Sequence, residues 1–426
     1  MNIDNNIVLS EKKEESSPIT VSIPDGADVI VGQHIYLVVT VKSPQVKSIK
    51  SITIDVPNNN IVVKKEEDWK LIDDTSGKAM FMLEIDDKLS SNTSISYTVH
   101  AYTDKNVDVE GIAPLIVNYT TKKVNEWGNS ISLSPNMILI QLQQKSNPID
   151  DPNSKYITYS GKLFDEDKNP LRNTQLAVLS ASFGRPLFDV SITTDPVDGE
   201  TPGLIDIKSI DNRDDFFIIN SDENGNVNFR IYPKEHHSVI LELNTQILGM
   251  GYEIPLQTTY IIAGDIPSPK LSSPRVIGML AGGVIKKEKE DKKFRVYIPN
   301  YLNSRPNNVI IFLVKDENNN SITLESTIIG EVNSAGYNFQ LSYEKIPFNK
   351  KLGLYYIALD IAANYAYSKS LNVIFEDDSG SGTNPNNGGN TGNGNHCDNG
   401  LYNKVDVDSN YEDGKFSLKI KSITLI

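Results

Sequence analysis

The stretch Ser221-Asp-Glu-Asn-Gly-Asn-Val-Asn-Phe-Arg-Ile-Tyr232 decides the fold class of this chain. It opens with an Asp/Asn/Gly turn at residues 222–226 and then alternates strictly between apolar and polar positions. On an extended chain the residues divide into two faces, Val227, Phe229 and Ile231 on one and Asn228, Arg230 and Tyr232 on the other. Alternation that follows directly on a tight turn is typical of a half-buried β-strand.

The same device occurs twice more in the chain. One copy is Gly77-Lys-Ala-Met-Phe81-Met-Leu83, and the other is Gly336-Tyr-Asn-Phe339-Gln-Leu341. In each copy a glycine-bearing turn leads into a strand that carries a phenylalanine. Copies more than about 100 residues apart indicate tandem domains rather than a solenoid of short repeats.

Length and composition agree with several soluble domains. The chain has 426 residues, of which 38% are hydrophobic, and domains usually contain roughly 100–150 residues. Many short apolar runs are separated by turn clusters, and no stretch has a helical period, which predicts an all-β chain of antiparallel β-sandwiches. No run of 18 apolar residues occurs, so we expect no transmembrane helix.

Turn clusters and composition shifts predict six segments. In chain order we expect a disordered lead-in (1–16), a first sandwich (17–123), a second sandwich (124–266) with a Pro/Gly/Asp-rich insertion (183–215), a third sandwich (267–377), a flexible Gly/Asn-rich linker (378–400) and a short β-segment (401–426). The insertion is either a contact surface or tolerated decoration, because long loops are functional or disordered.

The net charge of −14 limits the partners that we expect. An acidic surface repels phosphate backbones and anionic lipid, so we expect neither nucleic-acid binding nor membrane insertion. The single cysteine, Cys397, allows no intramolecular disulfide and no cysteine metal cluster. Residues 1–10 lack a basic start and an apolar core, which predicts no secretory signal of ordinary form.

Two landmarks in the second predicted sandwich resemble those of a known family. They are Gly161-Lys-Leu-Phe-Asp-Glu-Asp-Lys-Asn-Pro-Leu171 and Asp222-Glu-Asn-Gly-Asn-Val-Asn-Phe229. Together they resemble the bacterial immunoglobulin-like domains of invasin- and intimin-type adhesin stalks. The resemblance covers roughly Ile131 to Ala263, and the flanking units are similar to looser members of the same class. It implies tandem immunoglobulin-like sandwiches that serve as stalk or binding modules.

Catalytic motifs are not found in the sequence. The five histidines have no catalytic or metal-binding spacing, and no serine-hydrolase elbow, zinc-protease, phosphate-loop or dinucleotide motif occurs. His100 is predicted to be a solvated strand residue, and His236 and His237 are placed in a hairpin loop. We therefore expect no enzyme, no catalytic residue and no cofactor.

Calcium is the metal whose ligand spacing the sequence partly matches. Oxygen-bearing residues alternate from Asp165, Asp222, Asp316 and Asp406, as they do at the start of a calcium loop. None of the four continues with the glycine and glutamate that such a loop requires. Asp and Asn also favour turns because they tolerate left-handed backbone, and this turn interpretation is preferred for the first three. Asp406, Asp408 and Asn410 remain the weak calcium candidates.

Two further features bear on binding. Four nearby tyrosines, Tyr355, Tyr356, Tyr365 and Tyr367, suit either ligand contact or cross-strand packing. Near the C-terminus, Phe416, Leu418 and Ile420 alternate with polar residues and predict one amphipathic strand. This strand either docks onto a partner by strand addition or begins a truncated domain.

These features together predict a non-enzymatic adhesion or binding protein of bacterial surface or secreted type. Its partner would be a protein or glycan ligand on a cell surface, and its location extracellular or on the cell surface, with the cytoplasm as the alternative. The second hypothesis is a structural subunit of a larger secreted or phage-like assembly that docks through its C-terminal strand.

Overall fold

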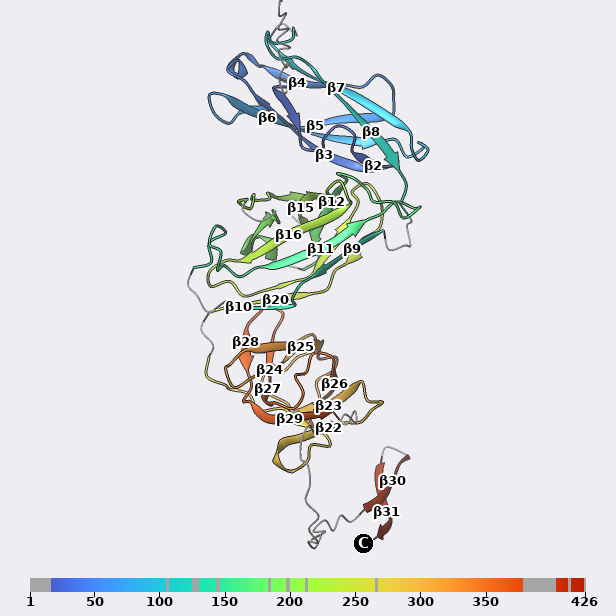
Figure 1. Cartoon of the computed structure of the whole chain (residues 1–426), viewed down its shortest axis with the longest axis vertical. Coiled ribbons are helices and arrows are strands. Elements are labelled where there is room, and N and C mark those ends of the chain that lie inside the picture. The colour runs from blue at the N-terminus through green and yellow to red at the C-terminus, as the bar shows by residue number, and fades with distance from the viewer. Residues whose placement is uncertain are drawn as a thin grey trace, which may run out of the picture. The chain divides into compact units, whose positions relative to one another are not determined.

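The computed structural model is all-β (Figure 1). It describes residues 17–104, 107–124, 130–142, 146–182, 185–196, 200–210, 214–264 and 267–377, and the backbone of residues 404–412 and 415–424. The predicted lead-in and the predicted linker at 378–400 lie outside these ranges. Within them the helical elements are short 3-10 turns, and no helix is long and apolar enough to cross a membrane.

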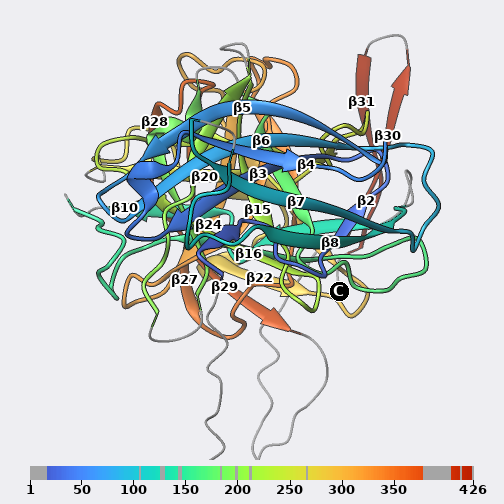
Figure 2. The same cartoon turned by 90° about the horizontal axis from the view of Figure 1, so that it is seen from above.

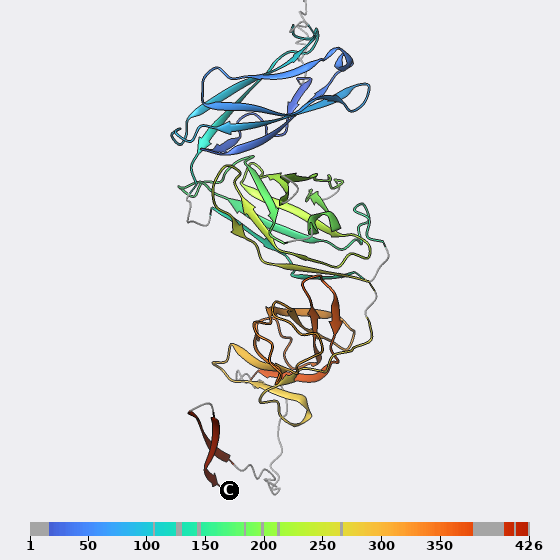
Figure 3. The ribbon, with the colours of Figure 1, turned by 180° about the vertical axis from the view of Figure 1, so that it is seen from behind.

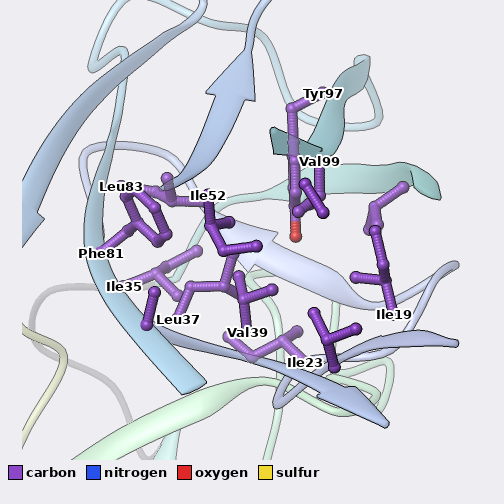
Figure 4. Close-up of a cluster of buried hydrophobic side chains, with 14 of the residues drawn as sticks. Ile19, Ile23, Ile35, Leu37, Val39, Ile52, Phe81, Leu83, Tyr97 and Val99 are labelled. Carbon is purple, nitrogen blue, oxygen red and sulfur yellow. The ribbon is translucent and has the colours of Figure 1, made fainter. Parts of the chain in front are cut away.

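The first sandwich consists of two four-stranded sheets (blue to cyan in Figure 1). In order, one sheet contains β1 (Ile19–Val21), β3 (His34–Lys42), β6 (Ser76–Ile85) and β5 (Ile61–Leu71). The other contains β2 (Asp28–Ile30), β8 (Leu115–Lys122), β7 (Ser94–Tyr102) and β4 (Ser51–Asp55), and η1 (Val46–Ser48) precedes β4. Alternate residues of both sheets fill the core, where Leu37 and Phe81 lie side by side on one sheet and Tyr97 enters from the other (Figure 4).

The second sandwich has its two main sheets stacked in layers (green to yellow in Figure 3). One contains β13 (Val190–Thr194), β16 (Asn226–Pro233), β11 (Ile157–Leu163) and β9 (Ile131–Pro135). The other contains β14 (Ile207–Ile210), β15 (Asp214–Asn220), β12 (Gln175–Ser180), β18 (Leu243–Gln246) and β19 (Ile254–Pro255). A smaller sheet contains β10 (Leu139–Leu142), β20 (Thr259–Ala263) and β17 (Val239–Leu241).

The strand quoted first, β16, lies between β13 and β11. Val227, Phe229 and Ile231 are fully buried, as the alternation predicts, and the Phe229 ring stacks on Tyr159 with centroids 5.0 Å apart. Tyr232 belongs to the second face, which a half-buried strand would expose, and for this residue the expectation is wrong. Its ring is buried against Tyr156 with centroids 5.0 Å apart, because the outer face of the strand is also covered there.

The third sandwich pairs a three-stranded sheet with a larger one. The smaller sheet contains β21 (Arg275–Val276), β23 (Lys293–Ile298) and β26 (Tyr337–Ser342). The larger contains β22 (Val284–Lys287), β29 (Leu371–Asp377), β27 (Lys351–Leu359), β24 (Val309–Lys315) and β25 (Ser321–Ile328), with β28 (Tyr365–Tyr367) added to β27. The short helix η3 (Ala281–Gly283) precedes β22.

One topology recurs in all three sandwiches. The strands β6, β16 and β26, which carry the repeated sequence pattern, each pair with the third strand of their sandwich (β3, β11 and β23), and that strand pairs in turn with the first. A short early strand also crosses to the opposite sheet and runs parallel to the last one, as β2–β8, β10–β20 and β22–β29. Figure 2 shows β2, β8 and β7 side by side in the first sandwich. This is the immunoglobulin-like arrangement.

The segment predicted as an insertion at 183–215 contributes regular structure to the second sandwich. Its described residues form η2 (Pro186–Asp189), β13 and β14. Val190 and Ile192 of β13 enter the core beside β16. The Pro/Gly/Asp-rich composition therefore marks the turns around two strands rather than an excursion that leaves the sandwich.

Residues 379–426 form a unit of their own. Its described backbone is a hairpin of β30 (Lys404–Glu412) and β31 (Lys415–Thr424). The sequence predicted one strand here, and the hairpin adds a second, whose register pairs Val407 with Ile420 and Tyr411 with Phe416.

Candidate functional site

Four turns of the second and third sandwiches share the pattern Asp-x-x-x-Asn. They are Asp165–Asn169, Asp222–Asn226, Asp316–Asn320 and Asp360–Asn364. In each turn the Asp carboxylate accepts the backbone N–H groups two and four residues ahead and the side-chain amide of the Asn, at 2.8–3.1 Å. The fourth residue has a positive φ in every turn (68°, 74°, 64° and 59°). These four turns are one repeated local structure.

This geometry confirms the turn interpretation for the three predicted positions. Both carboxylate oxygens of each Asp already accept hydrogen bonds from the Asp's own turn, and within the described residues no group of three or more acidic, His or Cys side chains is placed to hold a metal. Partial burial alone would raise the pKa of Asp222, but the hydrogen bonds from Asn226 and Asn224 lower it below its usual value. The fourth turn, at Asp360, escaped prediction because apolar residues lie between its Asp and Asn.

The calcium candidates Asp406, Asp408 and Asn410 lie on strand β30 rather than in a loop. The register places Asp408 opposite Lys419 and Asn410 opposite Ser417. A strand spaces alternate residues roughly 6.6 Å apart along its axis, whereas a calcium loop wraps its ligands around the ion. The backbone thus differs from the predicted loop, and calcium binding by these residues stays a prediction.

Two histidines of the folded domains, His100 and His237, lie against carboxylates. His100 was predicted to be solvated, but its side chain is only 18% exposed and lies between Asp108 (3.0 Å from Nδ1) and Asp55 (3.7 Å from Nε2). His237 lies in the predicted hairpin loop, 3.1 Å from Asp189. Among the described residues neither imidazole is hydrogen-bonded to a Ser, Thr or Cys that would serve as a nucleophile.

The junction between the first and second sandwiches contains a buried charge. Asp28, on β2, is 1% exposed, and its carboxylate accepts the backbone N–H of Arg172 at 2.9 Å and the Arg172 Nε at 3.2 Å. Two backbone contacts extend the pair, because the Asp28 N–H donates to the Arg172 carbonyl and the Asp28 carbonyl accepts from Thr174 Oγ1. The hydrogen bonds to Asp28 raise the pKa of the Arg172 guanidinium.

A second set of contacts at this junction joins β3, and Gln33 just before it, to β12 and β15. Gln33 donates its side-chain amide to the Gln175 carbonyl at 2.8 Å. The Tyr36 ring packs against Phe216 with centroids 5.8 Å apart, in a small apolar cluster with Leu179 and Ile218. Ile30 of the first sandwich enters the apolar core of the second. Hydrogen bonds, a charge pair and apolar burial thus all cross this junction.

The junction between the second and third sandwiches is an apolar interface between two sheets. The small sheet of the second sandwich contributes Ile262, and the large sheet of the third contributes Ile311, Ile357 and Leu359, all nearly or fully buried in one cluster. Alternate residues on the same strands, such as Ile310, point into the core of the third sandwich. The strands β24 and β27 of the large sheet therefore bury both of their faces.

The four tyrosines divide between these two faces. Tyr356 belongs to the core of the third sandwich, whereas Tyr355, Tyr365 and Tyr367 belong to the interface cluster. The rings of Tyr365 and Tyr367 meet edge to face, with centroids 5.9 Å apart. The packing interpretation is confirmed for the group, although for three of its members the packing joins two domains rather than neighbouring strands alone.

Sequence reasoning missed both junctions, although one signal for the second was visible. The runs at 309–314 and 354–359 are apolar without a break, and both are buried along their whole length. A strand that faces solvent on one side alternates, whereas an unbroken apolar run indicates burial on both sides. The contacts of Asp28 and Gln33 have no such local signal, because their partners lie more than 100 residues away.

Comparison with known proteins gives structural similarity only. No protein-family model matches the chain, and no curated protein matches its sequence. Among solved structures the chain is similar to the D0–D1 domain of intimin, with 11% identity over 57% of this chain and 97% of that one and a TM-score of 0.19.

Two further solved structures are similar to it. For the C-terminal domain of the Streptococcus pyogenes antigen I/II-family protein AspA, the identity is 8% over 58% of this chain and 99% of that one, and the TM-score is 0.18. For a tetra-tandem repeat from the extending region of a large adhesion protein, the identity is 12% over 83% and 74%, and the TM-score is 0.17. TM-scores this low carry no argument, so the immunoglobulin-like assignment stands on the sheet topology.

Proposed function

We propose that this protein is a non-enzymatic adhesion or binding protein of bacterial surface or secreted type. Its immunoglobulin-like domains, with boundaries near residues 123 and 266, act as spacer and recognition modules. The observation that carries this proposal is the burial at both junctions, where Asp28 and Ile311 are removed from solvent by a neighbouring domain. Packed junctions suit a chain that must present a recognition surface at a defined distance from its attachment point.

The partner that we propose is a protein or glycan ligand on a cell surface, met by an extracellular or surface-bound protein. The net charge of −14 argues against nucleic acid and against membrane insertion. The proposal assigns no catalytic residue. Its support is that the His and Asp groups considered for chemistry have structural partners, namely Asp108 for His100 and Asn226 for Asp222.

The test is binding by the intact chain. We expect retention on a glycan array or on host cells that saturates with protein concentration and is lost after mild unfolding. Hydrolysis of any polysaccharide on the array would overturn the non-enzymatic part of the proposal. Absence of binding to both glycans and cells would overturn the adhesion part.

The second candidate is a structural subunit of a larger secreted or phage-like assembly. The observation that favours it is the hairpin β30–β31, because a two-stranded hairpin is marginally stable on its own in water and requires a host surface. Deletion of residues 401–426 tests it. Loss of stoichiometric capture of a neighbouring subunit would support the assembly role, and unchanged oligomeric state and capture would exclude it.

A further inference from the structure

A groove with a volume of about 720 Å³ lies where the second and third sandwiches meet. Gln141 of β10 and Lys155 line it from the second sandwich. From the third, Lys315 of β24 and Ser321 of β25 line it, together with the segment that follows β28. The groove is at the edge of the apolar interface, so its walls are held by the packing that joins the two sandwiches.

The charge of this groove is opposite to that of the whole chain. Its lining includes Lys155, Lys315 and Lys369 and no Asp or Glu, although the chain carries a net charge of −14. Within the described residues, none of these lysines forms an ion pair with a carboxylate. The nearest acidic residue in sequence, Asp316, directs its carboxylate into its own turn.

Two of the three cationic groups, Lys155 and Lys315, are held by neighbouring residues. Lys155 Nζ donates to the Gln141 carbonyl at 2.9 Å, and Tyr367 donates its hydroxyl to the Gln141 side chain at 3.0 Å. Lys315 Nζ lies 5.9 Å from the centre of the Tyr355 ring, and the Tyr355 hydroxyl is 3.0 Å from Ser321 Oγ. A bound anion would therefore meet ammonium groups and hydroxyl groups that the two sandwiches already hold in place.

We propose that this groove binds a short, carboxylated saccharide such as a terminal sialic or uronic acid. This inference rests on the proposed function, because it names a glycan as the ligand. Three ammonium groups match a carboxylate, and the Ser321, Thr323 and Ser370 hydroxyls match the hydroxyls of a sugar. The volume lies within the roughly 300–1,000 Å³ of small-ligand sites.

The charge distribution selects a short ligand over a long one. A polyanion such as nucleic acid would extend beyond the three lysines onto a surface whose net charge is negative, and the repulsion there would oppose binding. A single acidic sugar makes all of its contacts within the groove. Its binding should weaken as salt is added, because partly exposed charge pairs are screened.

The test is calorimetric titration of the intact chain with N-acetylneuraminic acid methyl glycoside and with uronic-acid disaccharides, against neutral methyl galactoside. We expect at least one acidic sugar to bind. The double variant Lys315→Gln/Lys369→Gln should weaken that binding roughly tenfold or more, because charge-assisted hydrogen bonds to the carboxylate are lost. The double variant Lys289→Gln/Lys292→Gln is the matched control, since both lysines are exposed, the pair removes the same two charges and neither lysine lines the groove.

Each other outcome overturns the inference. Equal binding of the neutral sugar, no heat with any acidic sugar at millimolar concentration, or unchanged affinity in the double variant would each reject the groove as an acidic-sugar site. Binding of a short Asp/Glu peptide in place of the sugars would reject it in favour of a peptide site. Cell binding by the same double variant separates the two proposals. If calorimetry rejects the groove and the protein still binds cells, the groove assignment fails while the adhesion role stands.

Discussion

The side chain of Gln175 forms two hydrogen bonds with the backbone of Tyr36 in the neighbouring sandwich. Its carbonyl oxygen accepts the Tyr36 N–H at 2.8 Å, and its amide donates to the Tyr36 carbonyl at 2.9 Å. Gln175 is buried and Tyr36 is partly buried, so both bonds are partly shielded from water. The side-chain amide thus bonds to Tyr36 as the backbone of a neighbouring β-strand would. In this way it connects the first sandwich to the second.

Replacing Gln175 with Ala should therefore loosen this junction. Both backbone groups of Tyr36 lose their partner in a partly buried site, which costs about 1 kcal/mol for each hydrogen bond removed. We expect hydrogen exchange at Tyr36 to accelerate while exchange in β7 and β8 is unchanged. Gln246→Ala is the control, because Gln246 bonds only to Met250 in its own sandwich. Equal protection of Tyr36 in both variants would contradict the assignment.

The apolar junction predicts a contrast between neighbours on β24. Ile311→Asp places a charge between the sandwiches, whereas Ile310→Asp places it in the core of the third sandwich. We expect Ile311→Asp to leave the third sandwich folded and to expose the joining segment. There the Lys270 N–H donates to the Tyr367 carbonyl at 3.0 Å.

Trypsin cleavage after Lys270 measures this opening. The Ile311→Asp variant should be cut at least about tenfold faster than the wild type, because cleavage follows the population of the open form. Ile310→Asp should instead unfold the third sandwich and expose cleavage sites throughout it. A cleavage rate for Ile311→Asp equal to that of the wild type would mean that the interface contributes little to docking.

The fourth residue of the repeated turn should respond differently to substitution in two of the turns. Gly225 has a φ of 74°, and a Cβ there would lie 2.8 Å from the Leu163 carbonyl oxygen. Gly225→Ala should cost roughly 2 kcal/mol or more, because left-handed backbone is unfavourable for Ala and the Cβ collides with main chain.

The equivalent position in the turn at Asp360 is already an alanine. Ala363 has a φ of 59°, so Ala363→Gly relieves about 1–2 kcal/mol of conformational cost. The gain is offset by about 0.5–1 kcal/mol of added unfolded-chain entropy and about 0.8 kcal/mol of lost methyl burial. We expect a net change within about 1 kcal/mol of zero. Denaturant unfolding of both variants checks the contrast, and equal destabilisation would exclude it.

The sequence predicted those features whose signals are local. Phe81, Phe229 and Phe339 mark equivalent strands because alternation and turn residues are set within a few positions. Tyr232 and the 183–215 segment were misjudged because their burial depends on elements distant in the chain. The junction residues Asp28 and Gln175 are polar, and their pairing is decided only when two folded sandwiches meet. The lysines of the basic groove come from separate segments, Lys155 before β11, Lys315 on β24 and Lys369 after β28, so no local sequence pattern predicts them together.

The turn carboxylates predict how the stability of the fold decreases at acid pH. Hydrogen bonds from Asn320 and Asn318 lower the pKa of Asp316, and those from Asn226 and Asn224 outweigh burial and lower the pKa of Asp222. A carboxyl group whose folded pKa is below its unfolded value of about 3.9 stabilises the fold fully above that value. The contribution is lost as pH falls through the folded pKa.

The variant Asp222→Asn/Asp316→Asn removes this dependence, because an amide does not titrate. Its stability should fall less steeply than that of the wild type as pH is lowered below about 4, while at neutral pH it should be the less stable protein. The double variant Asp167→Asn/Glu317→Gln is the matched control, since it removes the same two charges from turns of the same kind and neither carboxylate has a hydrogen bond among the described residues. Urea unfolding midpoints between neutral and acidic pH give the comparison. Parallel acid limbs in wild type and double variant would show that the turn charges do not stabilise the fold.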